Sequence, residues 1–222
     1  MMTRSAPVEP NVRRAELRVK SHGEQIVSMP ALRRHRWTSD EVRRLIDERP
    51  GMSPRYELVD GELLVTPAPS DRHQRIIARL FLLLHPYLTS EKLGEGRLGP
   101  GELPLVPGER YEPDLFVLPV VDGRLRPAGD RNFSPLLVCE VLSQSSSRHD
   151  RITKRRAFQR NGVPEYWVID GDAEAIEVWH PDDERAALID ERVVWQPLGA
   201  GSAFELDVRA LFAAVADYAP LS

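Results

Sequence analysis

The chain has 222 residues, of which 41% are hydrophobic and 29% charged, and its formal net charge is −4. This composition supports a packed core and excludes disorder over the whole length. The single cysteine, Cys139, excludes an intrachain disulfide and a zinc site made of several cysteines. The N-terminus lacks an apolar signal region, and no stretch is long and apolar enough to cross a bilayer. We therefore expect a cytoplasmic protein without membrane contact.

Residues 1–30 differ in composition from the rest of the chain. They are rich in Arg, Pro and Ser and show neither helical nor strand periodicity. We predict a flexible N-terminal tail over residues 1–30, followed by one domain over residues 31–222.

Local signals predict the first regular elements. Thr38 and Glu41 have the spacing of a capping box, so a helix should begin here and end before Pro50. The pair Asp60-Gly61 separates two short apolar runs, a pattern typical of a β-hairpin. The two expected strands cover residues 56–59 and 62–65.

A long helix is predicted from Ser70 to about Leu88, and Pro86 should bend or end it. Its apolar positions form a wide stripe that would face a core: Ile76, Ile77, Leu80, Phe81, Leu83 and Leu84. Two strand-like runs joined through Pro107-Gly108 come next, at residues 103–106 and 115–118, and residues 120–134 are expected to form a loop.

The second half of the chain predicts a crossover within a sheet. Residues 135–142 are almost continuously apolar, which is typical of a strand buried on both faces. A helix over residues 149–160 then leads to a second buried strand at residues 166–169, an order that favours parallel pairing. A meander at residues 175–179, 187–189 and 193–195 and a last helix capped by Asp207 should follow. The predicted fold class is therefore α/β, with a mixed sheet flanked by helices and a C-terminal β meander.

Two carboxylates occur where packing alone would not place them. Asp114 follows Pro113 at the start of a strand, and Glu140 interrupts the most apolar strand of the chain. Two buried acids on neighbouring strands would repel each other, and a hard divalent ion such as Mg²⁺ or Mn²⁺ would relieve this repulsion. The alternatives are a solvated turn residue for Asp114 and an ion pair with an arginine at the core edge for Glu140.

The helix after Glu140 is strongly basic. Residues 147–160 contain six Arg or Lys residues and one Asp, a local charge of +5. We predict that Arg148, Arg151 and Arg155 bind nucleic-acid phosphates. The alternative is an ordinary solvated helix surface.

Four segments together resemble one family. They are YELVDGE (56–62), EPD (112–114), LVCEVLS (137–143) and NGVPEYWVID (161–170). In this order they are similar to the Uma-type (Uma-two) family of putative restriction endonucleases, which itself resembles the PD-(D/E)xK nuclease superfamily. The resemblance implies a restriction-endonuclease-like fold and Mg²⁺-dependent (or Mn²⁺-dependent) cleavage of DNA.

The resemblance also implies site residues. Asp114 would be the aspartate of the PD pair and Glu140 the second acid, both of them metal ligands. The family's hairpin acid would be Glu62, a further ligand, and its early helical histidine would be His73. The alternatives are an exposed residue beside a turn for Glu62 and a histidine facing water for His73.

One departure from the superfamily pattern concerns the catalytic lysine. Leu142 stands where the superfamily has a lysine, two residues after the second acid. The resemblance assigns this role to Lys154 of the following helix, and Asp150, one turn earlier, would pair with it and hold its direction. The alternative is that Lys154 only joins the phosphate-binding arginines.

Two functions follow from these observations. The first is a metal-dependent DNA endonuclease, and the alternative is a noncatalytic homo-oligomer that binds nucleic acid or another partner on the same scaffold. The chain has no P-loop and no G-x-G-x-x-G after a strand, so we expect no nucleotide cofactor. Trp179 and Trp195 lie on late strands with few elements left to cover them, which predicts a homodimer.

Overall fold

The computed structural model describes residues 35–48, 51, 53–125 and 134–216, all within one compact unit, His35–Ser222. The predicted tail over residues 1–30, and its boundary with the domain, lie outside the described residues. No helix in this described part combines the length and hydropathy needed to span a membrane.

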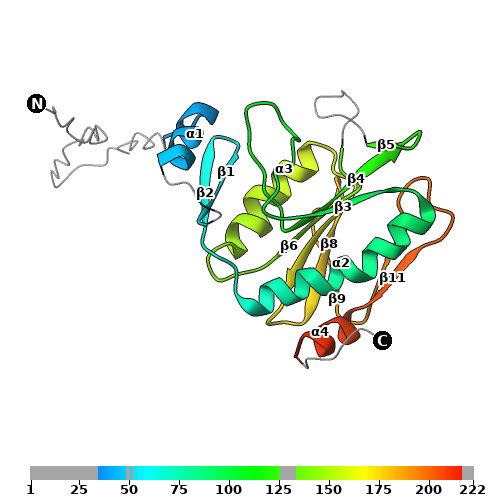
Figure 1. Ribbon diagram of the computed structural model, residues 1–222. Coiled ribbons are helices and arrows are strands. Elements are labelled where there is room, and N and C mark those ends of the chain that lie inside the picture. The colour runs from blue at the N-terminus through cyan, green and yellow to red at the C-terminus, as the bar shows by residue number, and fades with distance from the viewer. Residues whose placement is uncertain (1–34, 49–50, 52, 126–133, 217–222) are drawn as a thin grey trace, which may run out of the picture. The chain divides into compact units, whose positions relative to one another are not determined.

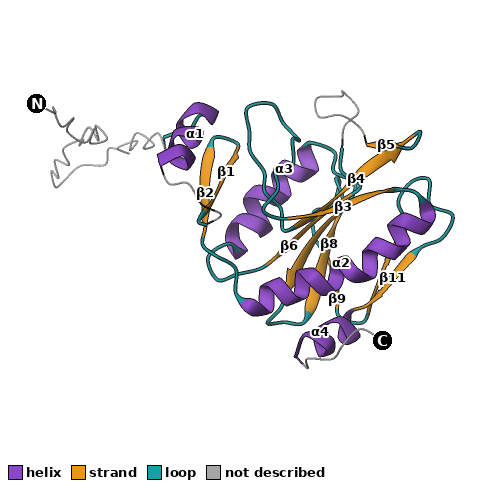
Figure 2. Ribbon diagram, viewed as in Figure 1, coloured by secondary structure: helices purple, strands orange, loops and turns teal. Residues whose placement is uncertain are grey.

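A mixed seven-stranded sheet forms the centre of the structure (Figures 1 and 2). Its strand order is β3-β4-β6-β7-β8-β9, and the short β5 pairs with β4. β6 and β7 are parallel, as the crossover pattern predicted, and the other neighbours are antiparallel. The strands are β3 (Gly94–Leu98), β4 (Leu115–Val121), β5 (Arg124–Leu125), β6 (Leu137–Val141), β7 (Tyr166–Asp170), β8 (Ala175–Trp179) and β9 (Ala187–Ile189).

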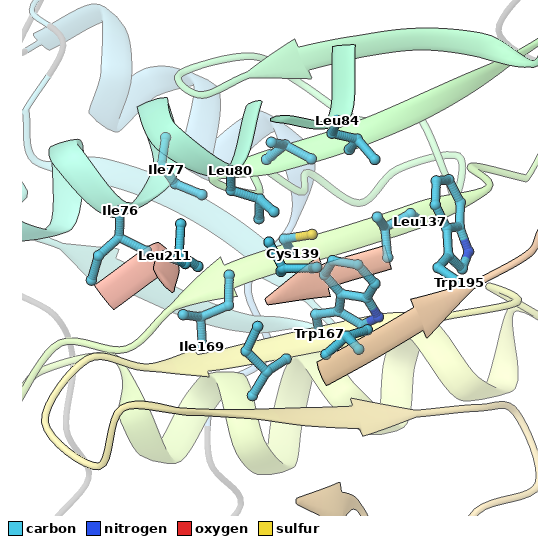
Figure 3. Packing of buried hydrophobic residues seen from close by; sticks show 14 of the residues in the cluster. Ile76, Ile77, Leu80, Leu84, Leu137, Cys139, Trp167, Ile169, Trp195 and Leu211 are labelled. Carbon is cyan, nitrogen blue, oxygen red and sulfur yellow. The ribbon is translucent and has the colours of Figure 1, made fainter. Parts of the chain in front are cut away.

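The long helix α2 (Asp71–Glu91) covers one face of this sheet. Ser70 caps it by accepting a hydrogen bond from the His73 backbone N–H, as predicted. Figure 3 shows side chains of α2, among them Leu80 and Leu84, above Cys139 of β6. The same apolar cluster includes residues of a separate two-stranded sheet, β10 (Arg192–Trp195) with β11 (Phe204–Asp207), and of α4 (Val208–Ala216).

The other face is covered by the basic helix and by the N-terminal hairpin. The helix begins as a π-helical segment, η1 (His149–Lys154), and continues directly as α3 (Arg155–Arg160). The hairpin consists of β1 (Arg55–Val59) and β2 (Glu62–Thr66), and α1 (Ser39–Glu48) packs against it. Residues of a strand alternate between faces, so Val138 and Glu140 of β6 belong to this second face.

Several predicted elements are confirmed at the level of individual bonds. Glu41 accepts hydrogen bonds from both the backbone N–H and the hydroxyl of Thr38, which completes the capping box. Asp60 and Gly61 have φ values of 53° and 72°, as the tight turn of a two-residue hairpin requires. Asp207 caps α4 through the backbone N–H of Ala210.

The prediction for the region of α2 was wrong in two respects. Pro86 does not end the helix, which continues to Glu91. Proline removes the bond to the carbonyl of Leu82, but both residues lie on the exposed side of the helix, where water can solvate that carbonyl. Leu83 was assigned to the core stripe but is 43% exposed.

The set of strands and one strand pairing also differ from the sequence prediction. β3 was missed because its sequence, GEGRL, has two glycines and no apolar run. A Cβ at Gly94 would lie 2.5 Å from the Leu118 carbonyl oxygen, so only glycine permits this approach to β4. Residues 103–106 make a single bridge, from Leu103 to Tyr111, in place of a strand. β10 leaves the predicted meander and pairs with β11.

Candidate active site

Asp114 and Glu140 meet where β4 and β6 lie side by side. Leu115 pairs with Cys139, so the next residues in this antiparallel register are Asp114 and Glu140. The Asp114 backbone N–H donates to Glu140 Oε2 at 3.4 Å, and the Val141 N–H donates to Asp114 Oδ2 at 2.9 Å. Both side chains are buried. The two acids singled out in the sequence therefore form one site, and the solvated-turn alternative for Asp114 is wrong.

Lys154 reaches this site from η1. Its Nζ lies 2.8 Å from Glu140 Oε1, 2.7 Å from Glu57 Oε2 and 3.3 Å from Asp150 Oδ1. The lysine side chain is only 3% exposed, so it belongs to the buried cluster and not to the surface of the helix. Asp150 pairs with Lys154 as predicted, and the partner of Glu140 is this lysine instead of an arginine.

Glu57 is the member of the cluster that sequence reasoning missed. It lies on β1, is fully buried, and accepts a hydrogen bond from the Glu112 backbone N–H at 2.8 Å through Oε1. The carboxylate thus connects the hairpin both to Lys154 and to the segment just before Asp114. Like Glu140, it is an acid inside an apolar run, and that signal could have found it.

Glu62, the predicted hairpin acid, lies elsewhere. The hairpin register pairs Glu57 with Leu64 and puts Glu62 beside the turn, opposite Val59. The Glu62 side chain is partly exposed and accepts from the Thr153 hydroxyl at 3.5 Å. The structure brings Glu57, not Glu62, into the carboxylate cluster.

Two cationic or hydrogen-bonding side chains hold Asp114. Arg55 Nη1 lies 2.9 Å from Oδ1, and His73 Nε2 lies 3.1 Å from Oδ2. Burial would raise the pKa of Asp114, but His73, Arg55 and the Val141 N–H outweigh it and hold this pKa below its usual value. His73 is 8% exposed, so the water-facing alternative for this histidine is wrong.

The Lys154 cluster is electrostatically coupled. Burial lowers the pKa of Lys154, but Glu140, Glu57 and Asp150 more than compensate, and the pKa lies well above its usual value. Burial raises the pKa of Glu140; Lys154 opposes this shift, whereas Asp114, Asp150 and Glu57 add to it. Lys154 is therefore a fixed ammonium and not a general base at neutral pH.

The donor set of the cluster fits a hard divalent cation. Four buried carboxylates face two permanent cations, Arg55 and Lys154, which leaves a formal charge of −2 before His73 is counted. Among the described residues, no three His, Cys, Asp or Glu side chains are grouped as a ready-made metal site. Mg²⁺ is commonly held by one or two carboxylates and keeps several waters, so Asp114 and Glu140 supply enough protein ligands for it.

A pocket gives access to the cluster. It has a volume of about 510 Å³, and the serine-rich loop, residues 143–146, forms part of its wall. Asp114, Glu140, Asp150, Lys154, Arg55 and His73 all contribute to its wall. The buried charges are therefore reachable by a substrate group.

The predicted phosphate-binding arginines have different surroundings. Arg151 binds Asp170 Oδ2 at 2.8 Å and Glu177 Oε1 at 2.6 Å. The Arg155 guanidinium lies 4.5 Å from the ring centroid of Trp179 and donates to Gln159. Arg148 is the exposed one of the three. Two of the three thus have intramolecular partners, and their binding of phosphates stays a prediction.

The reasoning that led to a homodimer was wrong about the tryptophans. Trp195 is 2% exposed and packs in the α2 cluster, and Trp179, 9% exposed, is covered by Arg155. Neither ring needs a second subunit to bury it. The homodimer itself stays a prediction.

Comparisons with known proteins give the family and the fold of the chain. The Uma2 family model, described as a putative restriction endonuclease, matches residues 39–209. An uncharacterized protein of Synechocystis sp., slr1290, is 27% identical over 166 residues, 71% of this chain and 85% of that protein. The crystal structure of a putative nuclease belonging to DUF820 from Anabaena variabilis has a TM-score of 0.61 at 20% identity, and covers 80% of this chain and 98% of that one. This last likeness shows the fold.

Proposed function

The chain belongs to the Uma2 family of putative restriction endonucleases, and on this premise we propose that it is a divalent-metal-dependent endonuclease that hydrolyses phosphodiester bonds in DNA. One observation carries the proposal: two acids from neighbouring strands and one buried ammonium converge on the wall of a single pocket. Phosphodiester hydrolysis needs these parts, because negative charge develops on the phosphate oxygens while water attacks phosphorus.

Asp114 and Glu140 would hold Mg²⁺ or Mn²⁺, whose chemistry is to polarise a phosphate oxygen and to lower the pKa of a bound water. Arg55 and His73 fix the orientation of the Asp114 carboxylate through one oxygen each. Such positioning matters because small displacements of a reacting group reduce rates strongly.

Lys154 would stabilise the developing charge on the phosphate. Its Nζ is fixed by Glu57, Glu140 and Asp150, so little reorganisation is needed when the substrate binds. Its raised pKa keeps it protonated, which suits charge stabilisation and excludes the abstraction of a proton from water. The lysine comes from a helix, yet its ammonium still contacts the second acid.

A second candidate function is the noncatalytic nucleic-acid-binding protein on the same scaffold. Its support is that the cations inside the cluster already pair with the carboxylates: Arg55 with Asp114, and Lys154 with Glu140. A network of this kind could serve the fold alone.

Metal binding and cleavage distinguish the two functions. We expect calorimetry with Mn²⁺ to detect binding to the wild type and none to the double variant Asp114→Asn, Glu140→Gln. Asp172→Asn is the matched control, because Asp172 is an exposed carboxylate on the rim of the same pocket. Cleavage of plasmid and single-stranded DNA should require Mg²⁺ or Mn²⁺ and should be lost in the double variant only. Wild-type protein that binds no divalent ion and cuts neither substrate would support the noncatalytic alternative.

A further inference from the structure

A second pocket shares a wall with the carboxylate pocket. It has a volume of about 260 Å³, and Arg55, His73 and Asp114 line both pockets. Ala68 and Pro69 also line both pockets, and the remaining wall comes from Ser53, the start of α2 and the turn after β3. Any group bound in this smaller pocket would therefore lie next to a phosphate bound at Asp114.

The walls of the smaller pocket suit a flat apolar ring. Ala68, Pro69, Ile77 and Pro100 supply apolar surface, and the two prolines are conformationally rigid. Its volume lies just below the usual range of about 300–1,000 Å³ for drug-sized ligands. A single heterocycle fits this space, whereas a run of stacked nucleotides does not.

His73 offers an unmet hydrogen-bonding atom in the shared wall. The residue is 8% exposed and its Nδ1 is buried without a hydrogen-bond partner among the described residues, although its Nε2 contacts Asp114. Buried polar atoms are nearly always satisfied, so this nitrogen at the shared wall requires a partner from a bound group or a water. If Nε2 carries the proton donated to Asp114, Nδ1 is an acceptor for an amino or hydroxyl group.

Gln74 adds a second polar group on the rim. It is exposed, and its backbone N–H donates to the Ser70 carbonyl. Its side-chain amide therefore offers both a donor and an acceptor at the entrance. A glutamine amide pairs in a bidentate manner with N6 and N7 of adenine.

From these features we infer that the smaller pocket binds one unpaired nucleobase, preferably adenine, beside the phosphate that is cleaved. The inference rests on the proposed nuclease function and adds a substrate class to it. A base inside a duplex has its faces stacked on its neighbours and cannot enter such a pocket. The substrate is therefore single-stranded, or has its base extruded at the cleavage site.

Nucleoside binding tests the pocket without metal or phosphate. Adenosine, guanosine, cytidine and uridine are titrated separately, with binding followed by saturation-transfer NMR. We expect the wild type to prefer adenosine over uridine by roughly tenfold, the discrimination that one bidentate pair gives. Gln74→Leu should abolish the preference. Gln144→Leu should keep it, because Gln144 is an exposed glutamine that lines the carboxylate pocket and not the smaller one.

The position of cuts in a single-stranded oligonucleotide of mixed sequence gives a second measurement. Wild-type cuts should be enriched next to adenine, and Gln74→Leu should remove the enrichment without shifting the thermal unfolding midpoint. Equal binding of the four nucleosides, or an adenosine preference that survives Gln74→Leu, would overturn the inference. A Gln74-dependent preference in a protein that fails the Mn²⁺ test would support the base pocket while it refutes the nuclease.

Discussion

The two faces of the central sheet bury different chemistry. On β6, Leu137, Cys139 and Val141 pack with the apolar residues of α2 on one face. On the other face, Val138 joins the cluster of α3 and the hairpin, while Glu140 binds Lys154. Hydrophobic burial is non-directional, so the first face needs only shape and apolar area. The second face works only if each charge has a partner at the right distance.

The partners on the charged face come from distant parts of the chain. Glu57 lies on the hairpin, Asp114 just before β4, Glu140 on β6, and Asp150 and Lys154 on η1. The α2 face is stabilised by many apolar contacts, and another apolar side chain can supply each of them. The charged face depends on a few ion pairs that need particular charged residues. The predictions below test this difference, from the largest expected effect to the smallest.

Removing the central ammonium should have the largest effect. Lys154→Ala leaves Glu57, Glu140 and Asp150 buried without their cation, and we expect the free energy of unfolding to fall by about 3–5 kcal/mol. Urea denaturation measures this loss. Arg156→Ala, an exposed position on α3, should change it by less than about 0.5 kcal/mol. Equal effects of the two substitutions would show that the three buried carboxylates do not need the lysine for stability.

A substitution that keeps the charge of Lys154 but changes its shape separates cleavage from DNA binding. Lys154→Arg should reduce turnover by about a hundredfold or more while DNA affinity stays near the wild-type value, since one positioned transition-state group is lost. Single-turnover cleavage and fluorescence anisotropy measure the two quantities. Arg156→Lys is the matched control and should retain wild-type turnover. If Lys154→Arg cleaves as fast as the wild type, Lys154 acts only as a general positive charge.

The two hairpin acids form a natural pair for comparison. Glu57→Gln weakens a buried ion pair with Lys154, and we expect a loss of about 1–3 kcal/mol in the free energy of unfolding together with slower cleavage. Glu62→Gln, at the partly exposed turn position, should change either quantity little. A larger effect at Glu62 would restore it as the hairpin acid of the site.

Acid should destabilise the protein through Asp114. The folded-state pKa of this group lies below the value of about 3.9 in the unfolded chain. Its contribution is therefore complete above about pH 4 and is lost as the pH falls through the folded-state pKa, an effect of about 2 kcal/mol. Unfolding measured from pH 6 to pH 2 should show a steeper loss in the wild type than in Asp114→Asn. Asp172→Asn, which alters an exposed carboxylate, should keep the wild-type slope.

The smallest effect concerns the exposed arginine of the basic segment. Arg148→Ala should lower the salt dependence of DNA binding by about one unit of slope, since one phosphate contact is lost. Arg151→Ala should instead reduce stability by less than about 1 kcal/mol, because its ion pairs with Asp170 and Glu177 are partly exposed. Equal changes in the salt slope would assign both arginines to phosphate binding.

Local sequence signals determined much of the fold. The Thr38 capping box, the Asp60-Gly61 turn and the Asp207 cap each act within a few residues, and each is present as predicted. The apolar run before Glu140 is long enough to require burial on both faces, and β6 is buried throughout. Such features follow from backbone geometry and hydrophobicity, so they can be read without the rest of the chain.

Other features depended on contacts that no local pattern contains. β3 exists because its glycines allow close approach to β4, and α2 passes Pro86 because that side of the helix faces water. The contact of the Arg155 guanidinium with Trp179, on a distant strand, could not be read from the sequence around either residue. The partner of a long charged side chain is set by whichever residue the fold brings within its reach.

The sequence by itself singled out Asp114 and Glu140, because acids in or beside buried strands are costly and need partners. The family resemblance assigned Lys154 to the same site. For the hairpin acid it pointed to Glu62 and missed Glu57, although both acids lie on one hairpin and differ in burial. Only the tertiary structure decided that choice: packing against the sheet fully buries Glu57 beside Lys154 and leaves Glu62 at the turn. The ion pairs of this site join side chains from different helices and strands. They therefore form only after these elements have packed together.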